Sequence, residues 1–222
     1  MVKRSLAKRL VSKVLVPVTK KYLERDREVK FMNMFLHVPS GVFHPSLFFS
    51  TKTMCQFLSS IDLTNKNILE IGCGSGAISI YVAKRKGIVY CCDINPLAVK
   101  TTTKNAERNG VNVSVVESDL FASIPDKKFD IILNNPPYYP KDPTNPEETA
   151  WYAGRNLEYF QHFFQQSLNF INPEGVIYMV LSDDCDLRRI DKIANKNGFT
   201  GKMIHTRQNL LEKTFVIAYS LR

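Results

Sequence analysis

The tetrapeptide Asn135-Pro136-Pro137-Tyr138 brings together residue types that can hold a flat amino group. Two adjacent prolines cannot continue a central strand, and they fix the direction of the neighbouring carbonyls. The amide oxygen of Asn135 and the carbonyl oxygen of Pro136 are both acceptors, so they can receive both hydrogens of an –NH2 group. The ring of Tyr138 can stack on that group. We therefore predict a site that directs a nitrogen lone pair toward a reacting carbon by positioning and electrostatics.

A second motif, Glu-Ile-Gly-Cys-Gly-Ser-Gly at residues 70–76, follows a predicted strand and opens a predicted helix. Its glycines, Gly72, Gly74 and Gly76, permit tight turning and let a ligand approach the backbone without meeting a Cβ atom. Free amides at the start of the next helix can receive a carboxylate or phosphate. The Gly-x-Gly-x-Gly spacing differs from the dinucleotide fingerprint Gly-x-Gly-x-x-Gly, which disfavours NAD. A tight strand-to-helix turn without a ligand is the alternative.

Two acidic residues stand at the ends of the predicted strands that follow. Asp93 can accept hydrogen bonds from both hydroxyls of a ribose. Asp119, which precedes Leu120, can accept from the amino group of an adenine; capping a helix or turn is the alternative for Asp119. With the glycine loop, these acids predict a nucleoside-containing cofactor.

Alternating strand-like and helix-like segments from residue 66 onward must position these motifs. Strands are predicted at 67–71, 88–92, 111–117, 129–133, 175–181, 202–206 and 213–220, and helices at 76–86, 96–109, 156–170 and 187–197. This order predicts an α/β fold with a doubly wound, mostly parallel, seven-stranded sheet that ends in an antiparallel strand pair. Both motifs then meet at one edge of the sheet, beside the proline-rich segment 134–155, which we interpret as a functional loop.

The net charge of +9 is concentrated at the N-terminus. Residues 1–30 hold ten Lys/Arg and three Asp/Glu, whereas residues 31–222 carry only +2. Apolar residues recur every four positions from Val2 to Val18, which predicts a helix with one apolar stripe. We predict a basic helical extension at 1–40 and a catalytic domain at 41–222. The extension fits an RNA grip, attachment to an anionic membrane surface, a transit peptide, or a helix packed on the domain.

Composition excludes several other classes of protein. No stretch approaches eighteen uncharged apolar residues, so no stable membrane insertion is expected. The five cysteines have no Cys-x-x-Cys spacing, so we expect free thiols, a cytoplasmic location and no metal site. Phe43 fits either a cover over the cofactor or a packing role, and Trp151 fits either stacking on a substrate ring or anchoring of its loop. Tyr159, Phe160, Phe163 and Phe164 have the spacing of a helix face that joins the core.

The glycine loop, Asp93 and residues 135–138 together resemble the class I S-adenosylmethionine-dependent methyltransferases, in the subgroup that carries an Asn-Pro-Pro-Tyr motif. The resemblance covers roughly residues 40–222. That subgroup methylates planar exocyclic nitrogens, namely the glutamine amide of release factors, adenine N6 or guanine N2 of RNA. The resemblance implies a Rossmann-like fold and S-adenosylmethionine as the cofactor.

The resemblance also implies a role for each motif residue. Glu70, Gly72, Gly74 and Gly76 would line the methionine part of the cofactor, Asp93 would hold its ribose, Asp119 and Leu120 its adenine, and Asn135, Pro136 and Tyr138 the target nitrogen, with Asn135 also beside the cofactor. No metal is implied.

The branch of the subgroup is left open by the sequence. The segments at 93–96 and 153–156 resemble eukaryotic and archaeal-type release-factor glutamine methyltransferases, whereas Gly41-Val-Phe43 resembles the small-domain ribosomal RNA guanine-N2 methyltransferases. The short basic N-terminal segment favours RNA or a ribosome-associated substrate. The partner is thus RNA, the ribosome or a release-factor-like protein. A noncatalytic RNA-binding module and a nucleotide-dependent oxidoreductase are the alternatives, and a structural Pro-Pro turn is the alternative for residues 135–138.

Overall fold

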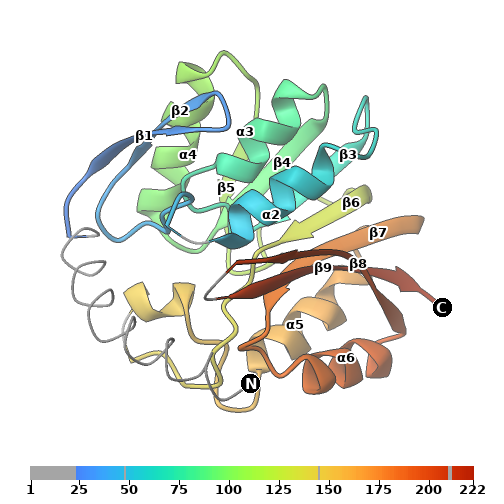
Figure 1. Cartoon of the computed structure of the whole chain (residues 1–222). Helices are drawn as coiled ribbons and strands as arrows, with labels where there is room; N and C mark the ends of the chain where they lie inside the picture. The colour runs from blue at the N-terminus through green and yellow to red at the C-terminus, as the bar shows by residue number, and fades with distance from the viewer. Residues whose placement is uncertain (1–23, 48, 145, 210–211) are drawn as a thin grey trace.

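The computed structural model describes residues 24–222 apart from residues 48, 145 and 210–211 (Figure 1). Its centre is a seven-stranded sheet with the order β5-β4-β3-β6-β7-β9-β8. The strands are β3 (Asn67–Ile71), β4 (Ile88–Asp93), β5 (Ser114–Glu117), β6 (Phe129–Asn134), β7 (Ile171–Ser182), β8 (Phe199–Gln208) and β9 (Lys213–Leu221). The five strands from β5 to β7 pair in parallel, and β9 pairs antiparallel with both β7 and β8. The predicted sheet and its antiparallel pair are confirmed.

Helices cover both faces of this sheet. They are α2 (Phe49–Leu58), α3 (Ala77–Lys84), α4 (Pro96–Arg108), α5 (Glu158–Ser167) and α6 (Leu187–Lys196), with a 3-10 helix η1 (Pro146–Ala150) before α5. Successive residues of a strand point to opposite faces, so Leu69 joins the core beneath α5 and α6, whereas Ile68 joins the core beneath α2 and α3. The buried rings of Phe160 and Phe163 confirm the predicted apolar face of α5. The fold is therefore doubly wound.

A β-hairpin stands where a helical extension was predicted to continue. Strands β1 (Arg27–Phe31) and β2 (Met34–Val38) pair antiparallel, and Met32 and Asn33 form the turn with positive φ angles of 45° and 63°. The alternating residues Met34, Leu36 and Val38 pack into the core beneath α3. The prediction of a helical region through residue 40 is therefore wrong for residues 27–38. The helix predicted over residues 2–18 lies outside the described residues.

Further differences concern individual elements and their bounds. Helix α2 was not predicted, although Met54 and Leu58 on its buried face have helical spacing. Strand β7 begins at Ile171 rather than residue 175, through an Asn-Pro-Glu-Gly run that reads as a turn. The pairing of β7 with β6 shifts register at this run, so Pro173 is accommodated at an irregularity where a strand tolerates a missing N–H.

Candidate active site

A cavity of about 350 Å³ lies at the carboxyl ends of β3, β4 and β6. It is formed where the glycine loop after β3 faces the proline motif after β6. Nine of the ten residues selected from the sequence line its wall: Glu70, Gly72, Gly74, Asp93, Asp119, Leu120, Asn135, Pro136 and Tyr138. The structure therefore brings the two motifs together in one site, as the parallel strand order requires.

The glycine loop is held in place by the end of β4. The backbone N–H groups of Gly72 and Cys73 both donate to the carbonyl oxygen of Cys92 at 2.9 Å. The N–H of Gly74 donates to Asp93 Oδ2 at 2.8 Å, and Asn95 N–H donates to Oδ1 at 2.9 Å. Burial raises the pKa of Asp93, while these N–H donors act in the opposite direction. Each carboxylate oxygen has a second lone pair, so Asp93 can orient the loop and still accept from a ligand.

Gly76 is the predicted site residue that does not line the cavity. It has a φ of +80° and precedes α3, and a Cβ atom added to it would lie 2.8 Å from Thr102 Cγ2. Glycine is therefore required at position 76 by the close packing of the loop against α4 and by the positive φ angle, not by space for a ligand. Gly72 is different, because a Cβ atom there would meet nothing within 4 Å.

Glu70 is a carboxyl group buried beneath the loop. Its residue is 2% exposed, and the hydroxyl of Ser79 on α3 donates to its Oε2 atom. Burial raises the pKa of Glu70 to about 8, although the hydrogen bond from Ser79 lowers it. A carboxyl in such a place binds a proton near neutral pH unless a cation comes close to it.

Asp119 is exposed at the rim of the cavity, after β5. Among the described residues its carboxylate has no hydrogen-bond partner, which removes the capping alternative there. The following turn is fixed by Leu120, whose φ is +49° and whose carbonyl oxygen accepts from Ser118 Oγ at 3.0 Å and from Cys92 Sγ at 3.2 Å. The free carboxylate is thus presented by a rigid turn.

The proline motif presents free acceptors to the same cavity. Within the described part of the chain, neither the side chain of Asn135 nor the carbonyl oxygen of Pro136 takes part in a hydrogen bond, and both residues line the wall. Tyr138 is half-buried, with its ring 4.9 Å from that of Tyr139. Burial raises the pKa of the Tyr138 hydroxyl, so this group stays protonated at neutral pH.

Two residues behind the motif were not selected from the sequence. Asn134, fully buried at the end of β6, donates from Nδ2 to the carbonyl oxygen of Ile71 at 3.0 Å and to the hydroxyl of Tyr159 at 2.8 Å. Tyr159 lines the cavity, so its assignment to the core was incomplete. The sequence signal for Asn134 was that a second asparagine stands directly before the Asn-Pro-Pro-Tyr motif.

Two loops line the cavity, namely the proline-rich loop after β6 and the loop at residues 41–45 before α2. The proline-rich loop folds back on itself, with Tyr139 N–H donating to Trp151 O at 3.1 Å and Ala153 N–H donating to Tyr139 O at 2.9 Å. Trp151 meets Phe43 from the other loop, with ring centroids 5.5 Å apart. Both residues line the cavity, which favours the covering role over packing alone for Phe43.

The sequence of residues 33–207, more than half of the chain, matches the family model of the methyltransferase small domain. The chain belongs to this family. S-adenosylmethionine is the cofactor of this small-domain methyltransferase, as the sequence resemblance implied. Among the described residues no helix is long and apolar enough to cross a membrane.

Curated relatives of this small-domain methyltransferase are named as methyltransferases, and the name of one specifies N5 of glutamine. It is 38% identical over 147 residues to a protein of Methanocaldococcus jannaschii named as a candidate protein N5-glutamine methyltransferase, covering 63% of this chain and 74% of the relative. It is 31% identical over 163 residues to the human methyltransferase HEMK2, covering 68% and 76%. It is 30% identical over 175 residues to the release factor glutamine methyltransferase of Lactococcus lactis, covering 73% and 64%. The chain is thus an S-adenosylmethionine-dependent N-methyltransferase, and the oxidoreductase alternative is not supported.

Solved structures share the fold of this small-domain methyltransferase. The T. thermophilus 16S rRNA N2 G1207 methyltransferase RsmC, in complex with AdoMet and guanosine, has a TM-score of 0.67 and 17% identity over 89% of this chain and 50% of that chain. The E. cuniculi Mtq2–Trm112 complex, described as methylating the termination factor eRF1, has a TM-score of 0.64 and 22% identity over 82% and 99%. At these identities the likeness shows the fold alone.

Proposed function

We propose that the chain methylates the side-chain amide nitrogen of a glutamine in a protein of the translation machinery, of the release-factor class. The observation that carries the proposal is that Asn135 and Pro136 present two unengaged acceptors to the same cavity as the glycine loop. A primary amide has two N–H hydrogens on one flat nitrogen, which two fixed acceptors satisfy together.

The donor half of the cavity has chemistry that fits S-adenosylmethionine. When bound, this cofactor supplies an electrophilic methyl group on a positively charged sulfur. Gly72 and Gly74 allow the backbone to approach the methionine part, and the buried carboxyl of Glu70 faces the same side. Asp93 offers its remaining lone pairs to the ribose, and the partnerless carboxylate of Asp119, beside Leu120, suits the adenine amino group. Gly76 does not line the cavity, and it allows this loop to pack closely against α4.

The acceptor half works by orientation. Asn135 Oδ1 and the Pro136 carbonyl oxygen each accept one N–H of the target amide, which rotates the nitrogen lone pair out of conjugation. The ring of Tyr138 packs on the amide plane. The new N–CH3 bond would replace the S–CH3 bond of the cofactor and leave S-adenosylhomocysteine. The proton hydrogen-bonded to Asn135 Oδ1 would become acidic as the nitrogen gains the methyl group, and it would pass to water. No strong base is needed, so the raised pKa of Tyr138 is compatible with its role.

The choice of glutamine over RNA rests on two observations. The relatives named for glutamine methylation match 147 and 175 residues, whereas a tRNA adenine-N6 methyltransferase of Pedobacter heparinus matches 123 residues. The charge is the second observation, because residues 31–222, which include the residues that line the cavity, carry a net charge of only +2, whereas the concentrated positive charge lies in residues 1–30. An RNA-binding surface needs a concentrated positive charge to neutralise phosphates. The described domain therefore suits a protein substrate better.

The test is transfer of radiolabelled methyl from S-adenosylmethionine into a cell extract that is then separated into protein and RNA. We expect the label in protein, and we expect acid hydrolysis to release it as methylamine, because a methylated amide yields that product. Asn135→Ala is the control and should remove the signal. Label in the RNA fraction alone would overturn the choice of substrate while leaving the methyltransferase assignment intact.

A cytoplasmic location is part of the same proposal. Its support is the class of substrate and the five cysteines, all of which are free thiols in the structure. Fractionation of cells followed by activity measurement in each fraction tests it, and activity confined to an organelle fraction would contradict it.

A further inference from the structure

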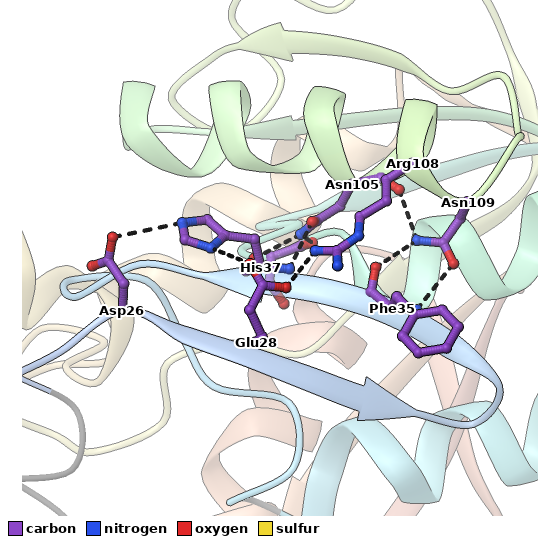
Figure 2. Close-up of polar contacts among 8 residues, drawn as sticks. Asp26, Glu28, Phe35, His37, Asn105, Arg108 and Asn109 are labelled. Carbon is purple, nitrogen blue, oxygen red and sulfur yellow. Dashed lines mark hydrogen bonds and ion pairs between the residues drawn. The ribbon is translucent and has the colours of Figure 1, made fainter.

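Helix α4 pairs with the hairpin through two side-chain amides (Figure 2). Asn105 Oδ1 accepts from the His37 N–H at 2.8 Å, and Asn105 Nδ2 donates to the His37 carbonyl oxygen at 2.8 Å. Asn109 makes the same two bonds with Phe35: its Oδ1 accepts from the Phe35 N–H at 3.1 Å, and its Nδ2 donates to the Phe35 carbonyl oxygen at 2.8 Å. Each amide thus makes the pair of bonds that a neighbouring strand would make.

The spacing of the two asparagines explains this fit. Four residues of an α-helix rise about 6.0 Å, and two residues of a strand rise about 6.6 Å. Amides at positions i and i+4 of α4 therefore match backbone groups at positions i and i+2 of β2. They cover the open edge of a two-stranded hairpin, which is marginally stable when it stands alone.

Asn105 reaches one group farther than Asn109. Its Nδ2 also donates, at 2.9 Å, to the carbonyl oxygen of Ser75 in the glycine loop, and the residue is 1% exposed. The second donor bond of Asn109 Nδ2 instead goes to the carbonyl oxygen of Asn105, inside the same helix. One buried amide therefore joins the hairpin directly to the loop of the methyl-donor site.

The hairpin in turn leads into the cavity wall. Strand β2 ends at Val38, and Gly41 and Phe43 already line the cavity. The carbonyl oxygen of Gly41 accepts from Asn95 Nδ2 at 3.3 Å. A Cβ atom on Gly74 would lie 3.6 Å from Phe43 Cβ, so this segment packs against the glycine loop. The hairpin, residues 41–43 and the glycine loop are therefore connected by contacts.

Ion pairs at the same interface are exposed. Glu28 pairs with Arg108 and with His37 Nδ1 at 3.1 Å, and Asp26 lies 3.6 Å from His37 Nε2 (Figure 2). The side chains of Glu28 and Asp26 are 61% and 63% exposed, so water and salt screen these pairs. The buried amide bonds are therefore the better candidates for coupling the hairpin to the donor site.

We infer that Asn105 is a positioning residue for the methyl-donor site: it couples docking of the hairpin to binding of S-adenosylmethionine without touching the cofactor. This inference rests on the assignment of the cavity to that cofactor. Coupling between two events is reciprocal, so the cofactor stabilises the docked hairpin by the same factor by which the docked hairpin strengthens cofactor binding.

The test compares Asn105→Ala with Asn109→Ala in the full chain. Calorimetry with S-adenosylmethionine should show affinity reduced about tenfold in Asn105→Ala, the size expected for a lost buried hydrogen bond, and less than about twofold in Asn109→Ala. At saturating cofactor the kcat of Asn105→Ala should stay near that of the parent chain, which separates positioning from chemistry. Equal losses in the two variants, or unchanged affinity in a folded Asn105→Ala protein, would overturn the inference.

A measurement on the unmodified chain serves if Asn105→Ala does not fold. S-adenosylmethionine should slow hydrogen exchange at the backbone N–H groups of His37 and Phe35, which Asn105 and Asn109 hold. Unchanged exchange in a cofactor-saturated protein would refute the coupling. Failure of the unmodified chain to bind the cofactor would instead refute the assignment of the cavity, so the two failures are distinguishable.

Discussion

Asn134 and Ile71 lie opposite each other on neighbouring parallel strands, and the side-chain amide of Asn134 donates to the backbone carbonyl of Ile71 at 3.0 Å. Ile71 is followed by the glycine loop, and Asn134 is followed by the proline motif. This single bond therefore connects the last regular residue before the donor side of the cavity with the last before the acceptor side. The same amide group also reaches the Tyr159 hydroxyl, which brings α5 into the connection.

Replacing Asn134 should impair the site without removing any group from its wall. In Asn134→Ala both bonds are lost and two buried partners are left without a donor, so we expect a loss of about 1–3 kcal/mol in unfolding free energy. We also expect reduced kcat, because the proline motif loses the hydrogen bond that fixes its position relative to β3. Tyr159→Phe removes only one of the two bonds and is the matched control. Denaturant unfolding and steady-state kinetics measure both effects, and an Asn134→Ala enzyme with normal kcat would contradict this role.

Asn135 should behave differently from its neighbour. Its side chain has no hydrogen-bond partner among the described residues, so Asn135→Ala should leave stability and cofactor affinity close to those of the parent chain. Turnover should fall by about 10²–10³-fold, the usual cost of removing one positioned polar group from a reacting centre. Calorimetry and methyl-transfer assays on the same preparation check the two halves. Retained turnover would show that another acceptor holds the nitrogen.

Gly72 in the glycine loop and Gly110 after α4 have similar backbone conformations, so the effects of alanine at the two positions can be compared. Gly72 and Gly110 have φ angles of +77° and +65°, and in both a Cβ atom would meet nothing within 4 Å. Substitution by alanine should therefore strain both backbones to a similar extent, by about 1–2 kcal/mol. Only Gly72 lines the cavity, so Gly72→Ala alone should weaken binding of S-adenosylmethionine. Equal affinities of the two variants would argue that the cofactor does not approach Gly72.

Glu70 should make stability depend on pH. Its pKa is near 4.5 in the unfolded chain and about 8 when buried in the fold. Between these values the unfolded form has released a proton that the folded form keeps, so stability should fall as pH rises from 4.5 to 8 and level off above. Asp93 has a raised pKa and acts in the same direction, so Glu70→Gln should reduce the slope without abolishing it.

Chemical denaturation at several pH values measures this slope. Glu117→Gln changes an exposed carboxyl on β5 and is the control. A slope that is unchanged in Glu70→Gln would mean that the carboxyl is already ionised in the folded protein at neutral pH.

The sheet and most of the site could be predicted because their determinants are local. Parallel strands that are buried on both faces show as short apolar runs, and Gly72 and Pro136 mark sharp departures at their carboxyl ends. Since those ends share one edge of the sheet, residues 72 and 136 had to converge. Asp93 follows from the same rule, because it stands at the end of the strand next to the glycine loop.

The features that were missed depend on contacts between distant segments. The hairpin is stabilised by Asn105 and Asn109, which lie some seventy residues away. No residue near β2 in the sequence indicates that side chains of α4 will bond to the backbone of this strand. Gly76 has the same sequence signature as Gly72, and only the neighbouring Thr102 shows that it serves packing. Tyr159 belongs to a helix face that is mostly core, and its place at the cavity depends on the bond from Asn134.

The hairpin changes where the smallest working form of this enzyme should begin. A shortened chain that starts at residue 41 would keep both motifs and every strand of the main sheet, but Asn105 and Asn109 would lose their hydrogen bonds to the backbone of β2. The apolar surface that Met34 and Leu36 now cover would also be bared to water, which favours aggregation. Trimming from the front should therefore stop before Asp26.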